Sequence, residues 1–418
     1  MRWLTILSCL VAGTAWAAVS PTKASYDGYK VFRVPVGARV QRVNSIVDEL
    51  GLHFWQPASR KGAFADVEVP PGKVKAFHEA MQGFDLVVMH EDLGKSVAEE
   101  GAFAVYADGS VNETWFESYH PFRDHLAWLR DLQKQYPNIS DVVSSGRSLE
   151  GNDIAGIHLH GSSGKGTKPA IVFHGTVHAR EWIASMVVEF MAYSLVRGYT
   201  DDKDIRGFLD KYDFYLFPIV NPDGFKYTQT RNRMWRKNRQ AREGSCAGTD
   251  INRNWPYKWD GPGSSTNPCA EDYRGEEAGD GAETKSLVGF LQQIKDRQGM
   301  KLYIDFHSYS QLFMTPYGFT CDALPTNNDE YQSLASGAAE AIRSVHGTEF
   351  QTGPICSTIY QTAGNSVDYL ADVVKSDYAF AVELRDRGRS GFVLPPDQIV
   401  PSGEEAFSGV KYLLQNMK

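Results

Sequence analysis

Residues 171–182 read IVFHGTVHAREW, and this stretch decides the fold of the larger part of the chain. An apolar, β-branched run such as residues 170–174 is typical of a buried strand, and the apolar segment 182–197 has the length of a helix. The loop between them carries His178 and Glu181, two side chains that can bind a metal. The stretch therefore predicts a strand, a loop with polar groups and a helix in succession.

Strands and helices are predicted to alternate on both sides of this stretch. The other predicted strands span residues 142–145, 154–160, 214–220, 302–307 and 378–384, and the other predicted helices span residues 125–136, 334–345 and 403–415. This alternation indicates an α/β domain with a mixed central β-sheet flanked by helices, which we expect over residues 111–418. In such sheets active groups gather at the carboxyl ends of the strands, where His178, His307 and Glu383 all lie.

Residues 18–110 form a smaller predicted unit of a different kind. Strands are predicted at residues 29–35, 52–55, 63–69 and 86–89, helices at 40–50 and 70–81, and an exposed connecting helix at 91–100. The order β-α-β-β-α-β is that of a ferredoxin-like α+β sandwich, a fold that assigns no function by itself. Because residues 96–122 contain no lysine or arginine, the boundary between the two units is expected between about 102 and 116.

The composition is that of an ordinary globular protein. The 418 residues exceed what one hydrophobic core usually serves, which favours two domains. Hydrophobic residues make up 42% of the chain and charged residues 22%, so the chain lacks the signature of disorder. A formal net charge of -8 argues against nucleic acid and an anionic membrane as partners.

Residues 1–17 have the parts of a secretory signal: an arginine, an apolar run, and small residues before a cleavage site near Ala17. The run is shorter than the ~20 residues of a membrane-spanning helix. We therefore expect a soluble protein that is secreted to the extracellular space. The sequons at Asn112 and Asn138 agree with this expectation.

Four cysteines remain after such a cleavage, and an even number suits disulfides in an oxidising compartment: Cys246, Cys269, Cys321 and Cys356. They allow three pairings, and sequential pairing is favoured because each bond then closes a short local loop. Residues 228–282 show little periodicity, and a structureless segment of that length is expected only where it is functional or covalently restrained. A bond between Cys246 and Cys269 could restrain it, with a stabilisation of ~3 kcal/mol.

A His-x-x-Glu pair is weak evidence for a metal site by itself. The chain holds a second copy at His346 and Glu349, after a predicted helix where no other reactive group gathers, and we interpret this copy as a surface turn. For the first copy, His307 at the end of a predicted strand supplies a third ligand. Two histidines and one carboxylate with an open position are typical of a catalytic zinc site. Asp250 is a candidate hydrogen-bond partner for His178.

Glu383 ends another predicted strand and has two interpretations. It could pair with Arg385 or Arg387 in a solvated charge cluster. Beside a zinc site it would act as the general base that takes a proton from water and returns it to a leaving amine. Three arginines in loops near these strand ends suit the binding of a carboxylate and an oxyanion: Arg180, Arg236 and Arg253.

Seven short motifs resemble those of the secreted zinc carboxypeptidases of the A/B type. In chain order they are HAREW at 178–182, NPDG at 221–224, MWRK at 234–237, NRNW at 252–255, DFHSYSQ at 305–311, IYQ at 359–361 and ELRD at 383–386. They occur in the family's order and with compatible spacing. The smaller unit resembles the family's inhibitory propeptide, which has the same split βαβ sandwich and covers the active-site cleft.

The resemblance implies a zinc-dependent carboxypeptidase that is made as a zymogen. The residues that would bind one zinc ion per chain are His178, Glu181 and His307. Glu383 would activate the attacking water, and zinc and Arg236 would stabilise the oxyanion.

The same resemblance assigns the substrate-binding residues. Those that would hold the C-terminal carboxylate of a peptide or protein are Asn252, Arg253 and Tyr360, and those further along the peptide are Arg180, Ser308 and Tyr309. A fixed distance from this carboxylate clamp to the zinc explains why only the last residue is removed. The peptide bond between Ser308 and Tyr309 would be cis.

The resemblance also defines a pocket for the terminal side chain. Its lining residues would be Met314, Gly318, Ile355, Ile359, Thr362, Val367 and Ala381. Members that prefer lysine or arginine have an acidic residue where this chain has Val367, and burying a cation there without a partner would be costly. We therefore expect the release of apolar and aromatic C-terminal residues. Asp368 adjoins this position, so a shift of one residue in the match would reverse the expectation.

Two further features bear on the resemblance to this family. The disulfide between Cys246 and Cys269 belongs to that pattern, whereas a bond between Cys321 and Cys356 occurs only in some members. Vertebrate digestive members are activated by a cut at a basic residue, but no lysine or arginine lies between positions 95 and 123 here. We therefore expect an activating protease of another specificity, which would cut near residues 103–109.

The same residues bear on competing functions. A regulatory-type carboxypeptidase of different specificity, or a relative that acts on a small amide, is disfavoured by the small N-terminal unit and the complete clamp. A catalytically impaired, zinc-binding secreted scaffold would lack the base, yet Glu383 and Arg236 are present. The expected partners are peptide or protein C-termini, the chain's own propeptide as inhibitor and an activating protease, and we expect a monomer.

Overall fold

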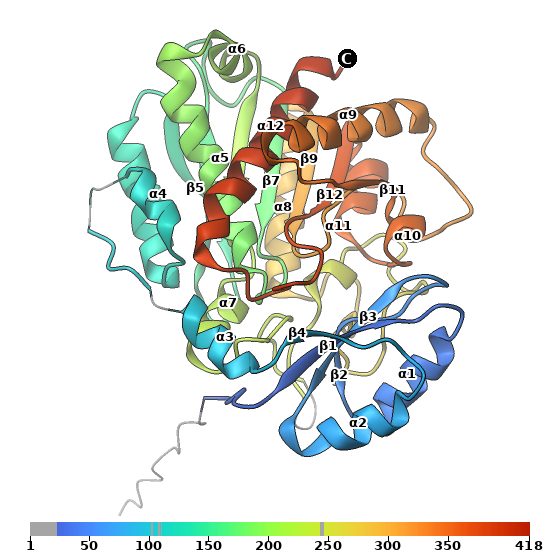
Figure 1. Cartoon of the computed structure of the whole chain (residues 1–418). Helices are drawn as coiled ribbons and strands as arrows, with labels where there is room; N and C mark the ends of the chain where they lie inside the picture. The colour runs from blue at the N-terminus through green and yellow to red at the C-terminus, as the bar shows by residue number, and fades with distance from the viewer. Residues whose placement is uncertain (1–22, 102, 108, 110, 243–245) are drawn as a thin grey trace, which may run out of the picture.

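The computed structural model describes residues 23–101, 103–107, 109, 111–242 and 246–418, which form a small and a large domain (Figure 1). The predicted signal, residues 1–17, lies outside the described residues. Within the described part of the chain, no helix is long and apolar enough to cross a membrane.

The small domain is an antiparallel four-stranded sheet with two helices packed against it (Figure 1). Its elements are β1 (Lys30–Pro35), α1 (Val40–Glu49), β2 (His53–Gln56), β3 (Phe64–Val69), the 3-10 turn η1 (Pro71–Lys73), α2 (Val74–Ala80) and β4 (Val87–His90). The strands are ordered β2-β3-β1-β4, and Val34, Val43, Val67 and Phe77 fill the core. The predicted order β-α-β-β-α-β is confirmed.

α3 (Leu93–Glu100) leads from the small domain towards the large one. Asp92 caps this helix by accepting a hydrogen bond from the backbone N–H of Lys95. The prediction of an exposed helix was wrong for one face, because Leu93 and Glu100 are buried. Leu93 and Val97, four positions apart, form an apolar stripe that packs in a cluster with residues of the large domain.

The large domain is built on a mixed sheet of eight strands in the order β11-β10-β12-β9-β7-β8-β6-β5. The strands are β5 (Ser140–Arg147), β6 (Asp153–Leu159), β7 (Ala170–Gly175), β8 (Asp213–Phe217), β9 (Met300–His307), β10 (Leu312–Thr315), β11 (Gln351–Pro354) and β12 (Tyr378–Glu383). The four central strands β12, β9, β7 and β8 run parallel. Their carboxyl ends therefore meet at one edge of the sheet, as the predicted α/β architecture requires.

Helices cover both faces of this sheet (Figure 1). They are α4 (Phe122–Gln135), α5 (Trp182–Asp201), α6 (Lys203–Lys211), α7 (Pro222–Thr230), α8 (Ala282–Gln298), α9 (Asn328–His346), α10 (Ile355–Thr358), α11 (Ser366–Tyr369) and α12 (Ile399–Asn416), with the short turns η2 (Glu113–Glu117), η3 (Ile251–Arg253), η4 (Leu370–Val374) and η5 (Pro396–Gln398). Alternate residues of β7 point to opposite faces: Phe173 belongs to the buried cluster that includes residues of α5, α9 and α12, whereas Val172 belongs to the cluster that includes residues of α8.

Several elements differ from the prediction for local reasons. β8 ends at Phe217, three residues early, because Pro218 has no N–H with which to continue the ladder. β10 and β11, with four residues each, were not predicted, and neither were α6, α7 and α8. Most of the segment between α7 and α8 is irregular, as the lack of periodicity indicated.

Candidate active site

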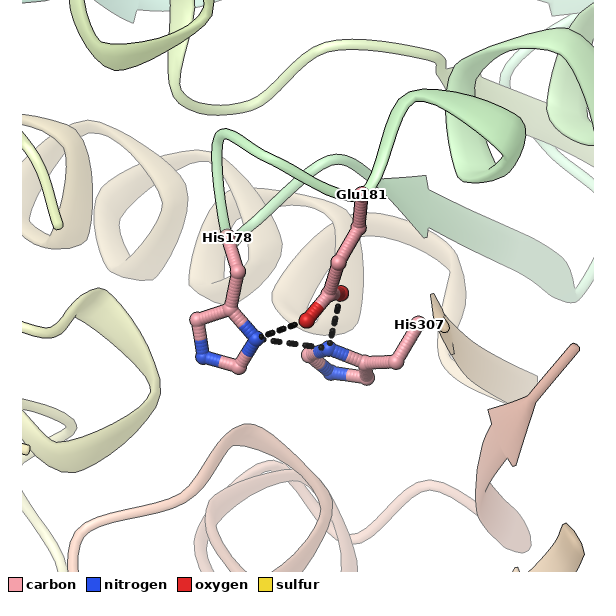
Figure 2. A group of neighbouring side chains, drawn as sticks. All are labelled: His178, Glu181 and His307. Carbon is pink, nitrogen blue, oxygen red and sulfur yellow. Dashed lines mark hydrogen bonds and ion pairs between the residues drawn. The ribbon is translucent and has the colours of Figure 1, made fainter. Parts of the chain in front are cut away.

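The three residues expected to bind zinc converge at the carboxyl edge of the sheet (Figure 2). His178 and Glu181 lie in the loop after β7, and His307 is the last residue of β9. The Glu181 carboxylate lies 2.7 Å from His178 Nδ1 and 3.0 Å from His307 Nδ1, and the two Nδ1 atoms are 3.1 Å apart. All three side chains are buried, and among the described residues they are the one group with the spacing of a metal site.

The second ring nitrogen of each histidine, Nε2, faces a carboxylate, as is usual for a metal-binding histidine. His178 Nε2 lies 3.2 Å from Asp250 Oδ1, and His307 Nε2 lies 3.2 Å from Asp305 Oδ2. When each Nε2–H donates to its carboxylate, both Nδ1 lone pairs face the Glu181 carboxylate. Three lone-pair donors at such short range repel one another unless a cation lies between them, so the donor set suits a divalent metal.

Charge around the cluster shifts the acidity of its members. Burial alone would raise the pKa of Glu181, but the neighbouring His178 and His307 rings bring it below the usual carboxyl value. Burial would lower the pKa of His307, but Asp305 and Glu181 raise it well above that of a free histidine. These charges therefore favour an ionised Glu181 next to a positively charged His307 ring.

Glu383 ends β12 directly beside His307, its partner in the parallel ladder. Its Oε2 atom is buried, and no described residue donates a hydrogen bond to it. Burial raises the pKa of Glu383 to about 8, and the neighbouring Glu181 carboxylate adds to the shift. A cation bound by the ligand cluster would favour the ionised form of Glu383.

The alternative in which Glu383 pairs with Arg385 or Arg387 is wrong. Arg385 forms a two-pronged ion pair with Glu405, and Arg387 donates to the backbone carbonyl of Glu349. Both arginines are thus engaged elsewhere, and Glu383 is left facing the ligand cluster.

Arg236 is held beside the ligands by Asp250. Its Nε and Nη2 atoms donate to Asp250 Oδ2 at 3.1 and 2.8 Å, while Asp250 Oδ1 faces His178. Burial disfavours the charged form, but the Asp250 carboxylate holds the pKa of Arg236 above its usual value. Asp250 therefore orients an imidazole and a permanent cation at once.

The residues expected to clamp a substrate carboxylate lie close together. Arg253 Nη1 donates to the Asn252 carbonyl at 2.9 Å, and its guanidinium carbon is 5.8 Å from the centre of the Tyr360 ring. Asn252 Nδ2 lies 3.2 Å from His307 Nε2, which connects this group to the ligand cluster.

The residues expected to contact the peptide further along lie beneath the small domain. Arg180 packs over the Phe392 ring and contacts Glu271 at 3.2 Å. The Tyr309 hydroxyl donates to Asp66 of β3 at 2.5 Å. Ser308 N–H points at Glu181 Oε2 across 3.3 Å, and the Ser308–Tyr309 bond is cis.

The predicted side-chain pocket is a contiguous group in the structure. Met314 and Ala381 are paired across β10 and β12, and a Cβ on Gly318 would meet both Thr362 and Ile355. The five apolar members belong to one buried cluster: Met314, Ile355, Ile359, Val367 and Ala381.

Asp368, next to Val367, is occupied by backbone donors. Its carboxylate accepts hydrogen bonds from the N–H groups of Gly318 and Phe319 and from the Asn365 amide, at 2.6 to 3.1 Å. Burial raises the pKa of Asp368 to about 6. This carboxylate fixes the loop that carries Gly318.

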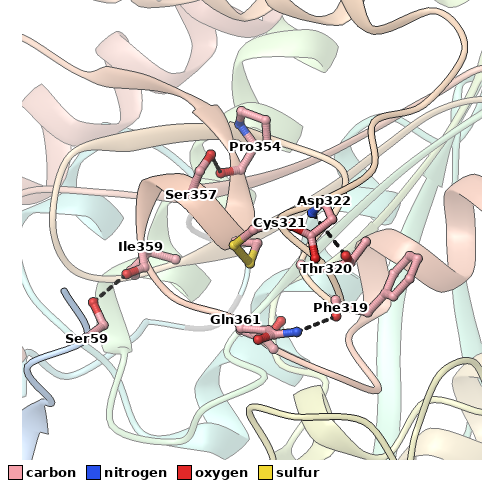
Figure 3. The surroundings of a disulfide bond; sticks show 12 residues. Ser59, Phe319, Thr320, Cys321, Asp322, Pro354, Ser357, Ile359 and Gln361 are labelled. Atoms are coloured by element: carbon pink, nitrogen blue, oxygen red, sulfur yellow. Dashed lines mark hydrogen bonds between the residues drawn. A yellow bond between two sulfur atoms is a disulfide. The ribbon is translucent and has the colours of Figure 1, made fainter.

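Two disulfides brace the loops around the site, in the sequential pairing. Cys246 is bonded to Cys269, and Cys321 is bonded to Cys356. Figure 3 shows the second bond, next to which the Gln361 amide donates to the Phe319 carbonyl at 2.8 Å. The same view shows Ser59 of the small domain donating to the Ile359 carbonyl at 2.8 Å.

The second His-x-x-Glu copy is a surface feature. His346 is the last residue of α9, is exposed, and lies 2.7 Å from Glu404. By contrast, the prediction overlooked Asp305 as a partner of His307. A signal was present, because residues two apart on a strand point to the same face.

A mixed α/β sheet with a His-Glu-His cluster at its strand ends, covered by a small α+β domain, defines a metalloenzyme with an N-terminal covering domain. The chain belongs to the zinc carboxypeptidase family, whose model matches residues 125–409, and a carboxypeptidase activation peptide model matches residues 37–100. It is therefore a zinc metallocarboxypeptidase with an activation peptide.

Relatives of known name support this assignment. A metallocarboxypeptidase A-like protein of Trichophyton verrucosum is 49% identical over 100% of both chains, and carboxypeptidase A4 of Mus musculus is 35% identical over 100% of this chain and 99% of its own. The crystal structure of thrombin activatable fibrinolysis inhibitor superposes with a TM-score of 0.86 at 27% identity, covering 93% of this chain and 98% of that one. The predicted family and fold class are confirmed.

Proposed function

We propose that this chain is secreted as a zymogen and that its mature domain removes apolar and aromatic residues from the C-termini of peptides and proteins. His178, Glu181 and His307 would hold one zinc ion, and Glu383 would be the base. The observation that carries the proposal is the buried, unpartnered Glu383 oxygen beside three converging ligand atoms. Zinc bound there supplies Lewis-acid chemistry and lowers the pKa of water towards 7.

Glu383 would take a proton from the attacking water and return it to the leaving amine. Its support is position: it ends the strand next to His307, and neither Arg385 nor Arg387 neutralises it. Arg236 would stabilise the oxyanion through Nη1, since Asp250 engages its other two nitrogens. The fixed ion pair means that this donor need not reorganise during the reaction.

Asn252, Arg253 and Tyr360 would bind the substrate's terminal carboxylate. Two of the Arg253 nitrogens already donate to backbone carbonyls, Nε to Gly263 at 2.7 Å and Nη1 to Asn252 at 2.9 Å. The guanidinium is thus held in one orientation, and Nη2 remains for a ligand. A clamp at a constant distance from the base limits cleavage to the last peptide bond.

The preference for apolar side chains is supported by the chemistry of the pocket. The apolar lining residues around Val367 carry no charge, and the Asp368 carboxylate accepts hydrogen bonds from the backbone N–H groups of Gly318 and Phe319 and from the Asn365 side-chain amide. A lysine or arginine side chain would enter without a counter-ion, which is costly.

The small domain, bounded near residue 110, would act as the inhibitor. Three contacts support this role: Asp66 holds the Tyr309 hydroxyl, Ser59 holds the Ile359 carbonyl, and Trp55 packs 5.2 Å from Phe392. Together they cover the expected peptide-binding residues. The chain would work as a monomer, with all of its site residues in one chain.

Activation would require a cut in residues 103–109 by a protease that does not need a basic residue. Val105 in this segment is 96% exposed, whereas Phe103 packs on Trp182 at 5.7 Å. N-terminal sequencing of the active form tests this point, and a start directly after Lys95 would contradict it.

The function is tested with processed protein and matched peptides that end in Phe, Leu or Lys, each with a free or an amidated C-terminus. We expect rapid release of Phe and Leu from the free acids, little release of Lys, and no release after zinc chelation. Equal rates on free and amidated peptides would remove the clamp, and a preference for Lys would remove the proposed specificity.

A further inference from the structure

Two Asn-x-Ser/Thr sequons lie outside the catalytic site, at Asn112 and Asn138. The acceptor in such a motif is the side-chain amide nitrogen, and a modified asparagine must lie on a surface that tolerates a bulky polar group. In the structure, the two asparagines differ in how far they meet these requirements.

Asn138 meets them in the turn between α4 and β5. Its side chain is exposed, and no described residue forms a hydrogen bond with it. The turn is secured by its neighbours instead: Ile139 N–H donates to the Tyr136 carbonyl at 3.2 Å, and the buried Ser140 hydroxyl donates to the same carbonyl at 2.7 Å. A substituent on the Asn138 amide would therefore break no hydrogen bond within the described part of the chain.

Asn112 differs because its side chain is used locally. Its Oδ1 accepts hydrogen bonds from Thr114 N–H at 2.9 Å and from the Thr114 hydroxyl at 2.6 Å, at the start of η2. The sequon at Asn112 therefore serves as a comparison for the sequon at Asn138.

A group on Asn138 would also stay clear of the peptide cleft. β5 is antiparallel to β6, β6 is antiparallel to β8, and β8 is parallel to β7. β5 therefore begins at the same end of the sheet as β7, whereas His178 and Glu181 follow the opposite end of β7. Asn138 and the ligand cluster thus lie at opposite ends of the strands.

The two disulfides indicate a cellular compartment in which this modification takes place. The bonds between Cys246 and Cys269 and between Cys321 and Cys356 form in an oxidising compartment, which in a eukaryotic cell is the secretory pathway. We propose that Asn138, in the exposed turn between α4 and β5, carries an asparagine-linked oligosaccharide; the inference rests on the proposed secretion of the chain.

The transfer is a substitution at the sugar's anomeric carbon. The Asn138 Nδ2 atom bonds to that carbon, the carbon–oxygen bond to a lipid-linked diphosphate donor breaks, the diphosphate leaves with the bonding electrons, and one amide proton passes to the departing diphosphate. No oxidant or reductant takes part.

The experiment uses the full chain secreted by a eukaryotic host. Peptide mapping after treatment with an amidase that releases asparagine-linked glycans should find aspartate at position 138, and Asn138→Gln should remove one glycan from the intact mass. Asn112→Gln serves as the matched control and should leave the glycan at position 138 in place. The secreted Asn138→Gln variant should keep the kcat/KM of the wild type.

An unmodified Asn138 in the secreted wild-type chain would overturn the proposal, whether or not the variant folds. These results are separate from the peptidase assay: an active enzyme without this glycan refutes only the present inference, and a glycosylated protein without peptidase activity refutes only the proposed function.

Discussion

Glu100, the last residue of α3, forms a buried two-pronged ion pair with Arg233 of the large domain. The Glu100 oxygens lie 2.5 Å from Arg233 Nε and 2.6 Å from Arg233 Nη2, and the two residues are 3% and 2% exposed. Arg233 also donates to the carbonyls of Arg180 and Phe392. Because Glu100 precedes the expected activation cut, this bond would persist after the chain is severed.

The ion pair predicts a lag between cutting and activity. Leaving one charge of a buried pair without its partner costs on the order of 2 to 5 kcal/mol, so Glu100→Gln should weaken retention of the severed activation peptide by at least about 30-fold. Activity should then appear together with the cut, as measured by comparing peptide hydrolysis with gel analysis over time.

Glu99→Gln is the matched control for this variant. Glu99 is an exposed neighbour whose carboxylate forms an ion pair with Lys95 at 3.8 Å, and its loss should leave the lag unchanged. If Glu100→Gln and the wild type show the same lag, the ion pair does not retain the severed peptide.

Glu383→Gln separates the proposed base from the metal ligands. The amide keeps the size of the side chain but cannot accept the proton, so kcat should fall by about 100- to 10,000-fold. Zinc content, measured by elemental analysis, should match that of the wild type, since Glu383 is not among the converging ligand atoms.

Glu349→Gln, a change at an exposed glutamate, should leave both zinc content and kcat as they are. Full activity of Glu383→Gln would show that another group removes the proton. A loss of zinc from Glu383→Gln would mean that this carboxylate helps to hold the metal.

How much of the fold could be predicted follows from the kind of signal each element carries. The buried strands β7, β9 and β12 are continuous apolar runs and were predicted within a few residues. β11 reads QTGP, and no propensity favours a strand with glycine and proline in its four residues. It exists because its register with β10 satisfies the backbone, which only tertiary structure reveals.

The site divides in the same way. His178, Glu181 and His307 could be proposed because ligand spacing and strand ends are visible in a sequence. The sequence could not predict which charged side chains form ion pairs with each other. Arg385 pairs with Glu405, twenty positions away, and Glu100 pairs with Arg233 across the domain interface. Such pairs depend on docking between distant segments, which leaves no local pattern.

Val367→Asp tests the proposed pocket chemistry. A buried carboxylate beside an apolar side chain is costly without a cation, so kcat/KM for a peptide ending in Phe should fall by at least about 10-fold, and that for Lys should rise. Val367→Asn is the control, since asparagine is polar and has the size of aspartate but carries no charge. Release of Lys by the asparagine variant as well would attribute the change to polarity, and an unchanged preference for Phe would place the pocket elsewhere.

His120 should make stability fall at acid pH. Its ring stacks on Trp115 with centroids 3.5 Å apart, and its Nε2 donates to the Trp115 carbonyl at 2.7 Å. Burial lowers the pKa of His120 from 6.5 to about 4. Because the unfolded chain binds this proton more tightly, the contribution of His120 to stability is fully present above pH 6.5 and is lost as the pH falls towards 4, up to about 3 kcal/mol.

Urea unfolding of wild type and His120→Phe between pH 7 and pH 4 measures this loss of stability. The variant should be less stable at pH 7, where it lacks the hydrogen bond, yet should lose less stability on acidification. His346→Gln, a change at an exposed histidine, should follow the wild type. Equal losses in wild type and His120→Phe would show that protonation of His120 does not set the acid limit.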